Sequence, residues 1–302
     1  MKVLVVIPVF YPGGIWLDCV LAIKTQVFQP DEVLIINSGA SDSVVELASA
    51  EGFHIVDIDK ASFNHGGTRQ FAIDIRPGFD LVVFLTQDAV LANTEALNNI
   101  LEGFQDKNVA AICGRQLPRP GAGPIETHAR LYNYPDVSTV RSLTDASLYG
   151  LKTAFMSNSF AAYRIAALMD VCGFPDNVIF GEDMFIAAKL LMAGYKISYS
   201  ANACVYHSHD YSLCQEFSRY FDMGVFHSRE PWLREQFGSA EGAGIKYLAS
   251  ELKYLAKYGL WKIPEAFLRT VFRYAGFRIG LMEKHIPMNI KKKFCMNKGY
   301  FN

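Results

Sequence analysis

The sequence predicts an α/β fold in which helices flank a mostly parallel sheet and a helical extension follows at the C-terminal end. Short apolar runs rich in Val, Ile and Leu alternate with stretches of helical spacing up to about residue 215. Polar residues do not interrupt the runs at 3–10 and 82–85, which is typical of strands that are buried on both faces. Beyond residue 215 the apolar residues recur at helical spacing.

The predicted elements alternate along the chain, so we expect parallel strands joined by right-handed crossovers. Strands are predicted at 3–10, 32–36, 54–58, 82–85, 157–163, 196–200 and 202–207. Helices are predicted at 15–25, from Ser41 or Asp42 through 48, after the glycines at 66–67, and from 182 to 194.

Composition limits the class of protein. The 302 residues are 51% hydrophobic with a formal net charge of −1, which suits one large domain with an appendage and argues against a nucleic-acid partner. Six cysteines lie far apart without a C-x-x-C pair, and the N-terminus shows no signal-peptide pattern, so a reducing cytosol is expected. No apolar run reaches the roughly 18 residues of a spanning helix, so we expect any membrane contact to be peripheral.

One carboxylate follows the buried strand predicted at 82–85. Asp88 comes directly after Thr86 and Gln87, and ligands of open α/β sheets bind at the carboxyl ends of the strands. Asp88 is therefore a candidate ligand contact. The alternative is that it caps a helix beginning near Asn93 or lies in a solvated turn.

A second candidate segment is the Gly66-Gly67 turn at the start of a helix. Backbone amides at a helix N-terminus suit a phosphate, and Arg69 would add a fixed positive charge. Taken alone, this pattern favours a structural role. The chain contains neither a G-x-G-x-x-G fingerprint after its first strand nor a P-loop motif, which argues against a dinucleotide oxidoreductase and a P-loop ATPase.

Two further groups carry titratable side chains. Glu182 and Asp183 open a predicted helix, where acidic residues usually serve the helix dipole. His207 and His209 follow the last predicted strand, and a neutral imidazole can bind a divalent metal, although a lone histidine is more often structural.

Several short motifs occur in a fixed order along residues 1 to about 215. They are IPVF at 7–10, INSGASD at 36–42, FNHGGTR at 63–69, LTQDA at 85–89, SNSFA at 157–161, GEDM at 181–184 and VYHSHDYS at 205–212. As an ordered set they resemble the family 2 inverting glycosyltransferases of the GT-A fold. The HGGTR and TQDA forms resemble the bacterial rhamnosyltransferase branch.

The resemblance implies roles for individual residues. Asp183 would be the general base with Glu182 beside it, and Asp88 would bind Mg²⁺ or Mn²⁺, with His207 or His209 as a further ligand. Separately from the resemblance, the helical segment at 219–224 could close over the diphosphate with Arg219 as its cation, or it could be a solvated helix face. The residues expected to contact substrate are Pro8, Val9, Phe10, Asn37, Ser38, His65, Gly66, Arg69, Gln87, Asp88, Ser157, Asn158, Glu182 and Arg219.

The sequence departs from the family pattern at two positions. Asn37 stands where the family usually has an acidic residue that helps to hold the nucleoside, so a hydrogen bond is kept and a charge is lost. Thr86-Gln87-Asp88 replaces the usual D-x-D metal motif and keeps only its second carboxylate. One carboxylate can suffice, because Mg²⁺ often binds through one or two carboxylates together with phosphates and water.

The expected function is inverting transfer of a deoxyhexose, L-rhamnose from dTDP-L-rhamnose, to a hydroxyl of a lipid-linked or polysaccharide acceptor in O-antigen-like biosynthesis. The alternatives are a family 2 transferase with a UDP-hexose donor and a catalytically silent, membrane-associated scaffold of polysaccharide assembly. We expect a catalytic domain at 1–215 and a helical extension at 216–302.

Two regions leave their roles open. The helices after residue 240 carry aromatic and basic residues, among them Arg269, Arg273 and Arg278, and could bind the inner face of the cytoplasmic membrane, pack on the catalytic domain or form a homodimer. Residues 115–150 are predicted to form either a mobile loop over the substrate cleft, with Arg115, Arg119 and Tyr132 as sugar contacts, or an ordinary surface loop.

Overall fold

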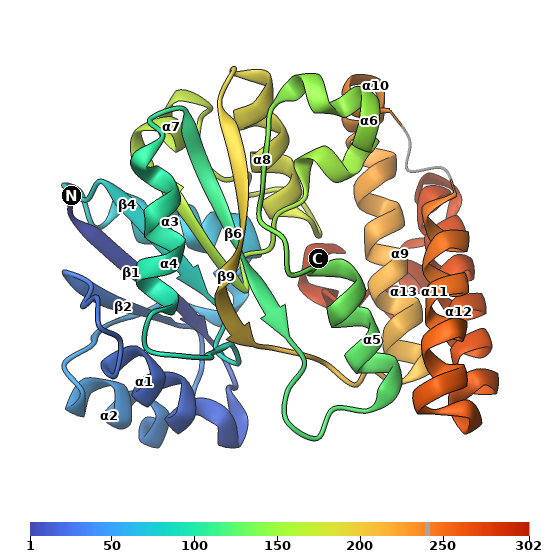
Figure 1. Ribbon diagram of the computed structural model, residues 1–302, viewed down its shortest axis with the longest axis horizontal. Helices are drawn as coiled ribbons and strands as arrows, with labels where there is room; N and C mark the ends of the chain where they lie inside the picture. The colour runs from blue at the N-terminus through green and yellow to red at the C-terminus, as the bar shows by residue number, and fades with distance from the viewer. Residues whose placement is uncertain (239–241, 302) are drawn as a thin grey trace.

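A computed structural model of the chain describes residues 1–238 and 242–301. A nine-stranded sheet with the order β3-β2-β1-β4-β8-β6-β9-β5, and with β7 paired to β9, forms the centre of the molecule. Helices cover the sheet, and the C-terminal helices form a separate layer beside it (Figure 1). The predicted α/β architecture with helices around a central sheet and helices at the C-terminal end is confirmed.

The first half of the sheet is parallel, as predicted. Its register pairs β2 with both β1 and β3, and β1 with β4. All five residues of β4 are buried, because the strand lies between neighbours and has apolar layers on both faces. The strands are β1 Val3–Val9, β2 Glu32–Asn37, β3 His54–Asp57 and β4 Leu81–Leu85, and the helices between them are α1 Trp16–Lys24, α2 Asp42–Ala50 and α3 His65–Asp74.

The second half of the sheet departs from the parallel order. β8 Phe160–Arg164 runs antiparallel to both of its neighbours, β4 and β6 Val109–Leu117. β9 Lys196–Tyr206 is one long strand where two were predicted, and its pairing with β6 shifts register after Gly114. The sheet is therefore mixed, since strand direction depends on connections that the apolar pattern does not encode. The remaining strands, β5 Val90–Leu91 and β7 Thr139–Arg141, both pair with β9.

Residues 115–150 contain helices and a strand, so the prediction that this segment is a loop is wrong. They contain the end of β6, α5 Pro124–Asn133, β7 and α6 Ala146–Tyr149. Tyr132 of α5 packs edge-to-face on Tyr247 of α11 Ala243–Tyr258, with ring centroids 5.1 Å apart. This contact links the segment to the C-terminal helices. The other helices are α4 Ala96–Leu101, α7 Ile165–Asp170, α8 Glu182–Met192, α10 Trp232–Phe237 and α13 Met288–Phe294.

The C-terminal layer is organised around α9 Leu213–Arg229 and α12 Ile263–Leu281. Their backbones approach so closely that a Cβ atom on Gly276 would lie 2.3 Å from the Phe217 carbonyl oxygen. Phe221 of α9 belongs to the same hydrophobic core as Phe84 of β4. The division of the chain at residue 215 stays a prediction. In the part that the structure describes, no helix is both long enough and apolar enough to cross a membrane.

Candidate active site

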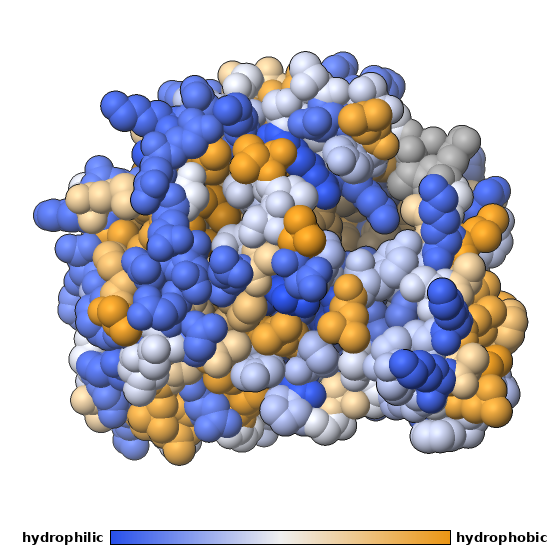
Figure 2. All heavy atoms as spheres, in the orientation of Figure 1, coloured by the Kyte–Doolittle hydropathy of each residue, from blue (hydrophilic) through white to orange (hydrophobic). Residues whose placement is uncertain are grey.

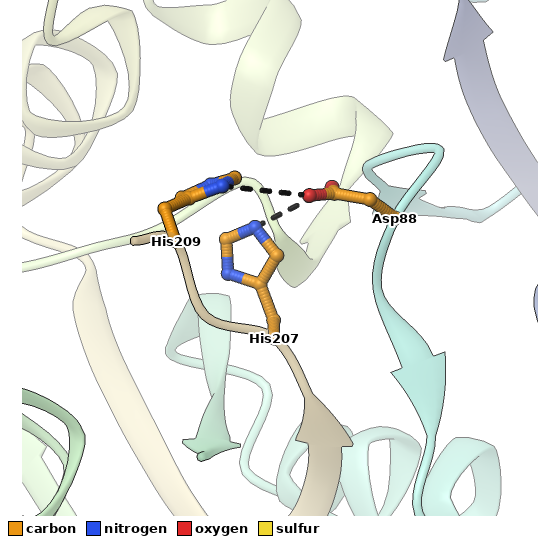
Figure 3. A group of neighbouring side chains, drawn as sticks. All are labelled: Asp88, His207 and His209. Carbon is orange, nitrogen blue, oxygen red and sulfur yellow. Dashed lines mark ion pairs between the residues drawn. The ribbon is translucent and has the colours of Figure 1, made fainter. Parts of the chain in front are cut away.

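A metal corner, which we define as Asp88, His207 and His209, lies where β4 and β9 end. The carboxylate of Asp88 lies 3.4 Å from Nε2 of His207 and 3.7 Å from Nδ1 of His209 (Figure 3). One ligand atom from each of the three residues lies within 4.8 Å of the others. The predicted partnership of Asp88 with His207 therefore has a geometric basis, and His209 joins it.

The electrostatics of the metal corner suit a cation. Burial lowers the pKa of His207 and lowers that of His209 to about 3, so both imidazoles are neutral near pH 7. Burial alone would raise the pKa of Asp88, but the polar groups around the carboxylate hold it below its usual range. One carboxylate and two neutral imidazoles are metal ligands, and the imidazoles suit a transition ion such as Mn²⁺ better than Mg²⁺. These residues fit a divalent cation.

Asp88 does not cap a helix, so that alternative is wrong. The next helix, α4, begins at Ala96 with Glu95 as its N-cap residue. The partner of Asp88 is instead Arg119, whose Nη2 lies 3.1 Å from Oδ2 and 2.7 Å from the backbone oxygen of Asp88. Arg119 therefore contacts the metal corner directly.

A base corner, which we define as Arg69, Asn158, Glu182 and Asp183, lies at the start of α8. Gly181 precedes the helix with a left-handed φ of 73°, which turns the chain so that the two acids follow directly. Glu182 is buried and accepts hydrogen bonds from Arg69 at 2.9 Å and from the Asn158 amide at 3.0 Å. Asp183 accepts from the backbone N–H groups of Met184 at 2.8 Å and Asn158 at 3.4 Å.

The two acids of the base corner differ in their pKa values. Burial would raise the pKa of Glu182, but Arg69 and His65 lower it, so Glu182 is ionised. Burial and the negative charge of Glu182 raise the pKa of Asp183 to about 7. A helix N-terminus would by itself favour the ionised form. The dipole role alone therefore does not account for Asp183, whose pKa suits proton transfer near neutral pH.

The HGG segment supports the base corner. Arg69 is buried and donates to the His65 carbonyl at 2.6 Å as well as to Glu182, so its charge is already paired. A Cβ atom on Gly66 would lie 1.8 Å from the Pro175 carbonyl oxygen, so close packing requires glycine there. His65, the first residue of α3, is exposed. These contacts favour the structural interpretation of the glycines.

The end of β2 restores a charge that Asn37 lacks. Asn37 donates from Nδ2 to Oδ1 of Asp57 at 2.7 Å, and its own oxygen accepts from the N–H groups of Gly39 at 3.1 Å and Ala40 at 2.7 Å. Asp57 ends the neighbouring strand β3 and is exposed. Sequence reasoning missed Asp57, although its position at a strand end was the signal that had identified Asp88.

The remaining expected residues fall into two groups. The side-chain oxygen of Gln87 accepts hydrogen bonds from the N–H groups of Phe10 at 2.7 Å and Tyr11 at 3.1 Å, so Gln87 holds the loop that follows β1. Pro8 and Val9 are the last two residues of β1. Ser38 and Ser157 make internal hydrogen bonds, since Ser38 donates to the Val9 carbonyl and Ser157 accepts from Gln116.

Arg219 of α9 lies over the rings of Phe180 and Tyr211. Among the described residues, Arg219 makes no ion pair, which leaves its charge free.

A mixed sheet flanked by helices is the architecture of the GT-A type glycosyltransferases. Solved structures share this fold. The mannosyltransferase PcManGT from Pyrobaculum calidifontis, in complex with GDP-Man and Mn²⁺, is similar with a TM-score of 0.59 and 16% identity over 99% of this chain and 84% of that chain. S. aureus TarS 1-349 in complex with UDP-GlcNAc is similar with a TM-score of 0.54 and 14% identity over 94% and 92%.

The particular family follows from sequence similarity. The family model described as Glycosyl transferase family group 2 matches residues 81–277, and the chain belongs to this family. The chain is 44% identical to the O-antigen chain rhamnosyltransferase RfbN of Salmonella typhimurium, over 100% of this chain and 96% of that protein. It is also 44% identical to the O-antigen chain rhamnosyltransferase WbaN of Salmonella anatum, over 98% and 95%. The resemblance identified from the motifs is confirmed.

Proposed function

We propose that this chain is a metal-dependent inverting rhamnosyltransferase that moves L-rhamnose from dTDP-L-rhamnose to a hydroxyl of a lipid-linked or polysaccharide O-antigen acceptor. The observation that carries the chemistry is the separation of two acids into different environments, Asp88 among imidazoles and Asp183 beside Glu182. The similarity to two O-antigen chain rhamnosyltransferases over nearly the whole chain supports the choice of sugar and acceptor.

Inversion requires one in-line displacement at the anomeric carbon. The acceptor oxygen forms a bond to that carbon as the bond to the diphosphate oxygen breaks, and the hydroxyl proton passes to the carboxylate of Asp183. A base with a pKa of about 7 is well matched to this task at neutral pH. The backbone N–H of Asn158 holds Asp183 in place, while Arg69 and the Asn158 amide hold Glu182, whose charge raises the pKa of Asp183 so that its ionised carboxylate can take up the proton.

The leaving diphosphate gains negative charge, and positive groups at the metal corner would stabilise it. A divalent cation on Asp88, His207 and His209 would neutralise that charge when bound. Arg219 is the candidate second cation, because its guanidinium lies over Tyr211, whose ring stacks on His209 with centroids 4.9 Å apart.

The donor base is expected at the ends of β2 and β3. Phe10 is exposed there with Lys60 Nζ 4.5 Å from its ring centroid. Asn37 donates to Oδ1 of Asp57, and among the described residues Oδ2 of Asp57 accepts no hydrogen bond. A carboxylate can accept the imide N–H that thymine and uracil share. This chemistry fits both dTDP and UDP donors. The base therefore does not distinguish dTDP-L-rhamnose from a UDP-hexose, and the two donors must be distinguished by their sugars.

A donor panel tests the proposal. The purified full chain would be incubated with Mn²⁺, the acceptor glycolipid and either dTDP-L-rhamnose, UDP-glucose or UDP-GlcNAc. We expect transfer with dTDP-L-rhamnose, and NMR of the product should show an anomeric configuration opposite to that of the donor. Preferred transfer from a UDP-hexose, or retention of configuration, would overturn the assignment. Absence of transfer from every donor would favour the scaffold alternative.

We also propose that the outer face of α12 binds the inner leaflet of the cytoplasmic membrane, where a lipid-linked acceptor would lie. Figure 2 shows hydrophobic side chains gathered at the edge of the molecule where α12 lies. The exposed apolar residues there are Trp261, Phe267, Leu268, Val271 and Tyr274. Exposed basic residues flank them at Lys253, Lys257, Arg278, Lys292 and Lys293. This pattern suits an anionic lipid surface.

Two residues of the predicted basic face point inward, which corrects the sequence interpretation. Arg269 and Arg273 both contact buried Glu216, with Nη1 of Arg269 at 3.3 Å and Nε of Arg273 at 3.0 Å. They hold α12 on α9 rather than serving a membrane. The outward charge therefore comes from the lysines and Arg278.

Vesicle sedimentation tests this surface. The double variant Val271→Glu/Tyr274→Glu should bind anionic vesicles much more weakly than the wild type, and salt should weaken the wild type because exposed charges are screened over about 8 Å at physiological ionic strength. Val27→Glu is the control, since Val27 is equally exposed on the other half of the molecule. A wild type that ignores vesicles but sediments as a dimer that the double variant breaks would assign this face to a homodimer instead.

A further inference from the structure

A buried glutamine, Gln116, lies behind the metal corner. It is the second-last residue of β6 and is 2% exposed. The strand register pairs Gln116 with Val205 of β9, and the backbone N–H of His207 donates to the Leu117 carbonyl at 3.0 Å. The two strands therefore hold the side chains of Gln116 and His207 together.

The contacts of Gln116 decide which way its amide faces. Nη1 of Arg130 lies 2.9 Å from Oε1 of Gln116, and Nε2 of Gln116 lies 2.8 Å from the hydroxyl of Ser157. A guanidinium has donors and no acceptor, so the atom facing Arg130 must be the amide oxygen. The orientation of this amide thus follows from the chemistry of its partner.

The same oxygen decides where His207 carries its hydrogen. Nδ1 of His207 lies 2.9 Å from Oε1 of Gln116, and a carbonyl oxygen can only accept, so Nδ1 must be protonated. A metal-binding imidazole is neutral and carries one N–H, which leaves a lone pair on Nε2. That atom is the one that lies 3.4 Å from Oδ1 of Asp88 (Figure 3). Two acceptor atoms that face each other favour a cation at this position.

We propose that Gln116 is a positioning residue of the metal site, which holds His207 in its Nδ1-protonated form so that the Nε2 lone pair and Asp88 are presented to one divalent cation. Arg130 anchors the amide that does this. The inference rests on the proposed metal-dependent function and adds residues outside the motifs. Partners that orient a metal-binding histidine typically contribute about 10- to 100-fold in metal affinity or activity.

The first test reads the tautomer in the metal-free protein. Long-range ¹H–¹⁵N correlation spectra of the full chain, with His207 assigned by comparison with His207→Gln, should show Nδ1 protonated. Gln116→Met removes the acceptor, so the signal should shift toward a mixture of tautomers. Gln116→Glu keeps an acceptor oxygen for His207 and Arg130, so the Nδ1-protonated form should be retained.

The second test measures Mn²⁺ affinity by titration with electron paramagnetic resonance. We expect Gln116→Met to bind Mn²⁺ about 10- to 100-fold more weakly. Gln116→Glu should stay within a few-fold of the wild type. Ser157→Ala is the matched control, because it removes the contact on the nitrogen side of the amide and leaves the oxygen side intact.

Each outcome supports or overturns a stated claim. A wild type that binds Mn²⁺ with Nε2 of His207 protonated overturns this inference alone, and so does a Gln116→Met protein with unchanged Mn²⁺ affinity. A wild type that does not bind Mn²⁺ overturns the metal dependence of the proposed function. If Gln116→Met does not fold, as judged by circular dichroism, the wild-type tautomer and the Gln116→Glu affinity still decide the question.

Discussion

The metal corner and the base corner each contain one central aspartate. The surroundings lower the pKa of the aspartate in the metal corner and raise the pKa of the aspartate in the base corner. Asp88 lies among two imidazoles and the Arg119 guanidinium, and its pKa is held below the usual range although burial opposes this. Asp183 is half-buried beside ionised Glu182, and partial burial together with that negative charge raises its pKa to about 7. The difference arises from neighbours rather than from residue type.

This contrast separates the chemical roles of the two acids. An acid that stays ionised suits a cation and a leaving phosphate, whereas an acid that titrates near neutral pH suits proton transfer. Pairs of acids with pKa values pushed apart are a general sign of divided roles in an active site. This division of roles would be wrong if Asp88 could be neutralised without loss of metal binding, or Asp183 without loss of proton transfer.

The largest expected effect is at the base corner. Asp183→Asn keeps the size of the side chain but cannot accept the acceptor proton, so turnover should fall by about 10²- to 10⁴-fold. Donor affinity by calorimetry should change little. Asp176→Asn is the control, because Asp176 is an exposed acid shortly before the same helix. A rate within a few-fold of wild type would remove Asp183 from the role of base.

A slightly smaller loss is expected at the metal corner. Asp88→Asn removes the only carboxylate among the three ligand candidates, and turnover should fall by about 10²- to 10³-fold, as when one stabilising group for developing charge is lost. In contrast to Asp183→Asn, this variant should also lose Mn²⁺ binding and donor affinity. Full activity of the wild type in excess EDTA would contradict the metal role.

The pH profile sharpens the comparison. Turnover should rise with pH through about 7 as Asp183 ionises. Glu182→Gln removes the adjacent negative charge, so the acid limb should move to lower pH. An unmoved limb would show that another group sets it.

Stability gives an independent check on Asp183. The folded-state pKa of Asp183 lies above the ordinary value of about 4, so this group contributes less stability as pH rises from about 4 to about 7. Urea unfolding at several pH values should show this decline in the wild type. The decline should be smaller in Asp183→Asn, which cannot ionise.

The smallest expected effect concerns Arg119, whose guanidinium forms an ion pair with Asp88. Arg119→Gln removes a partly exposed ion pair, and such pairs contribute about 0.2–1 kcal/mol. Mn²⁺ affinity should therefore increase by up to about fivefold if the guanidinium competes with the metal. A decrease in affinity would mean that Arg119 orients Asp88 for the metal.

Much of the fold and the central residues of the site followed from local sequence patterns. Apolar runs and their alternation with helices predicted the parallel half of the sheet, because a strand that is buried on both faces consists of a continuous run of apolar residues. Asp88 and Asp183 were identified because each follows or starts a clear element, and the ordered motifs gave them roles.

Only the tertiary structure decided which partners these residues contact and in which direction their side chains point. Several features depend on contacts between distant parts of the chain. They are the antiparallel β8, the helices within 115–150, the pairing of Arg69 with Glu182 and the inward direction of Arg269 and Arg273. Gln116 has no local signal, because a single glutamine near a strand end looks like any polar residue. Periodicity records which face of an element is buried, whereas pKa values, amide orientation and ligand geometry depend on the neighbours that folding supplies.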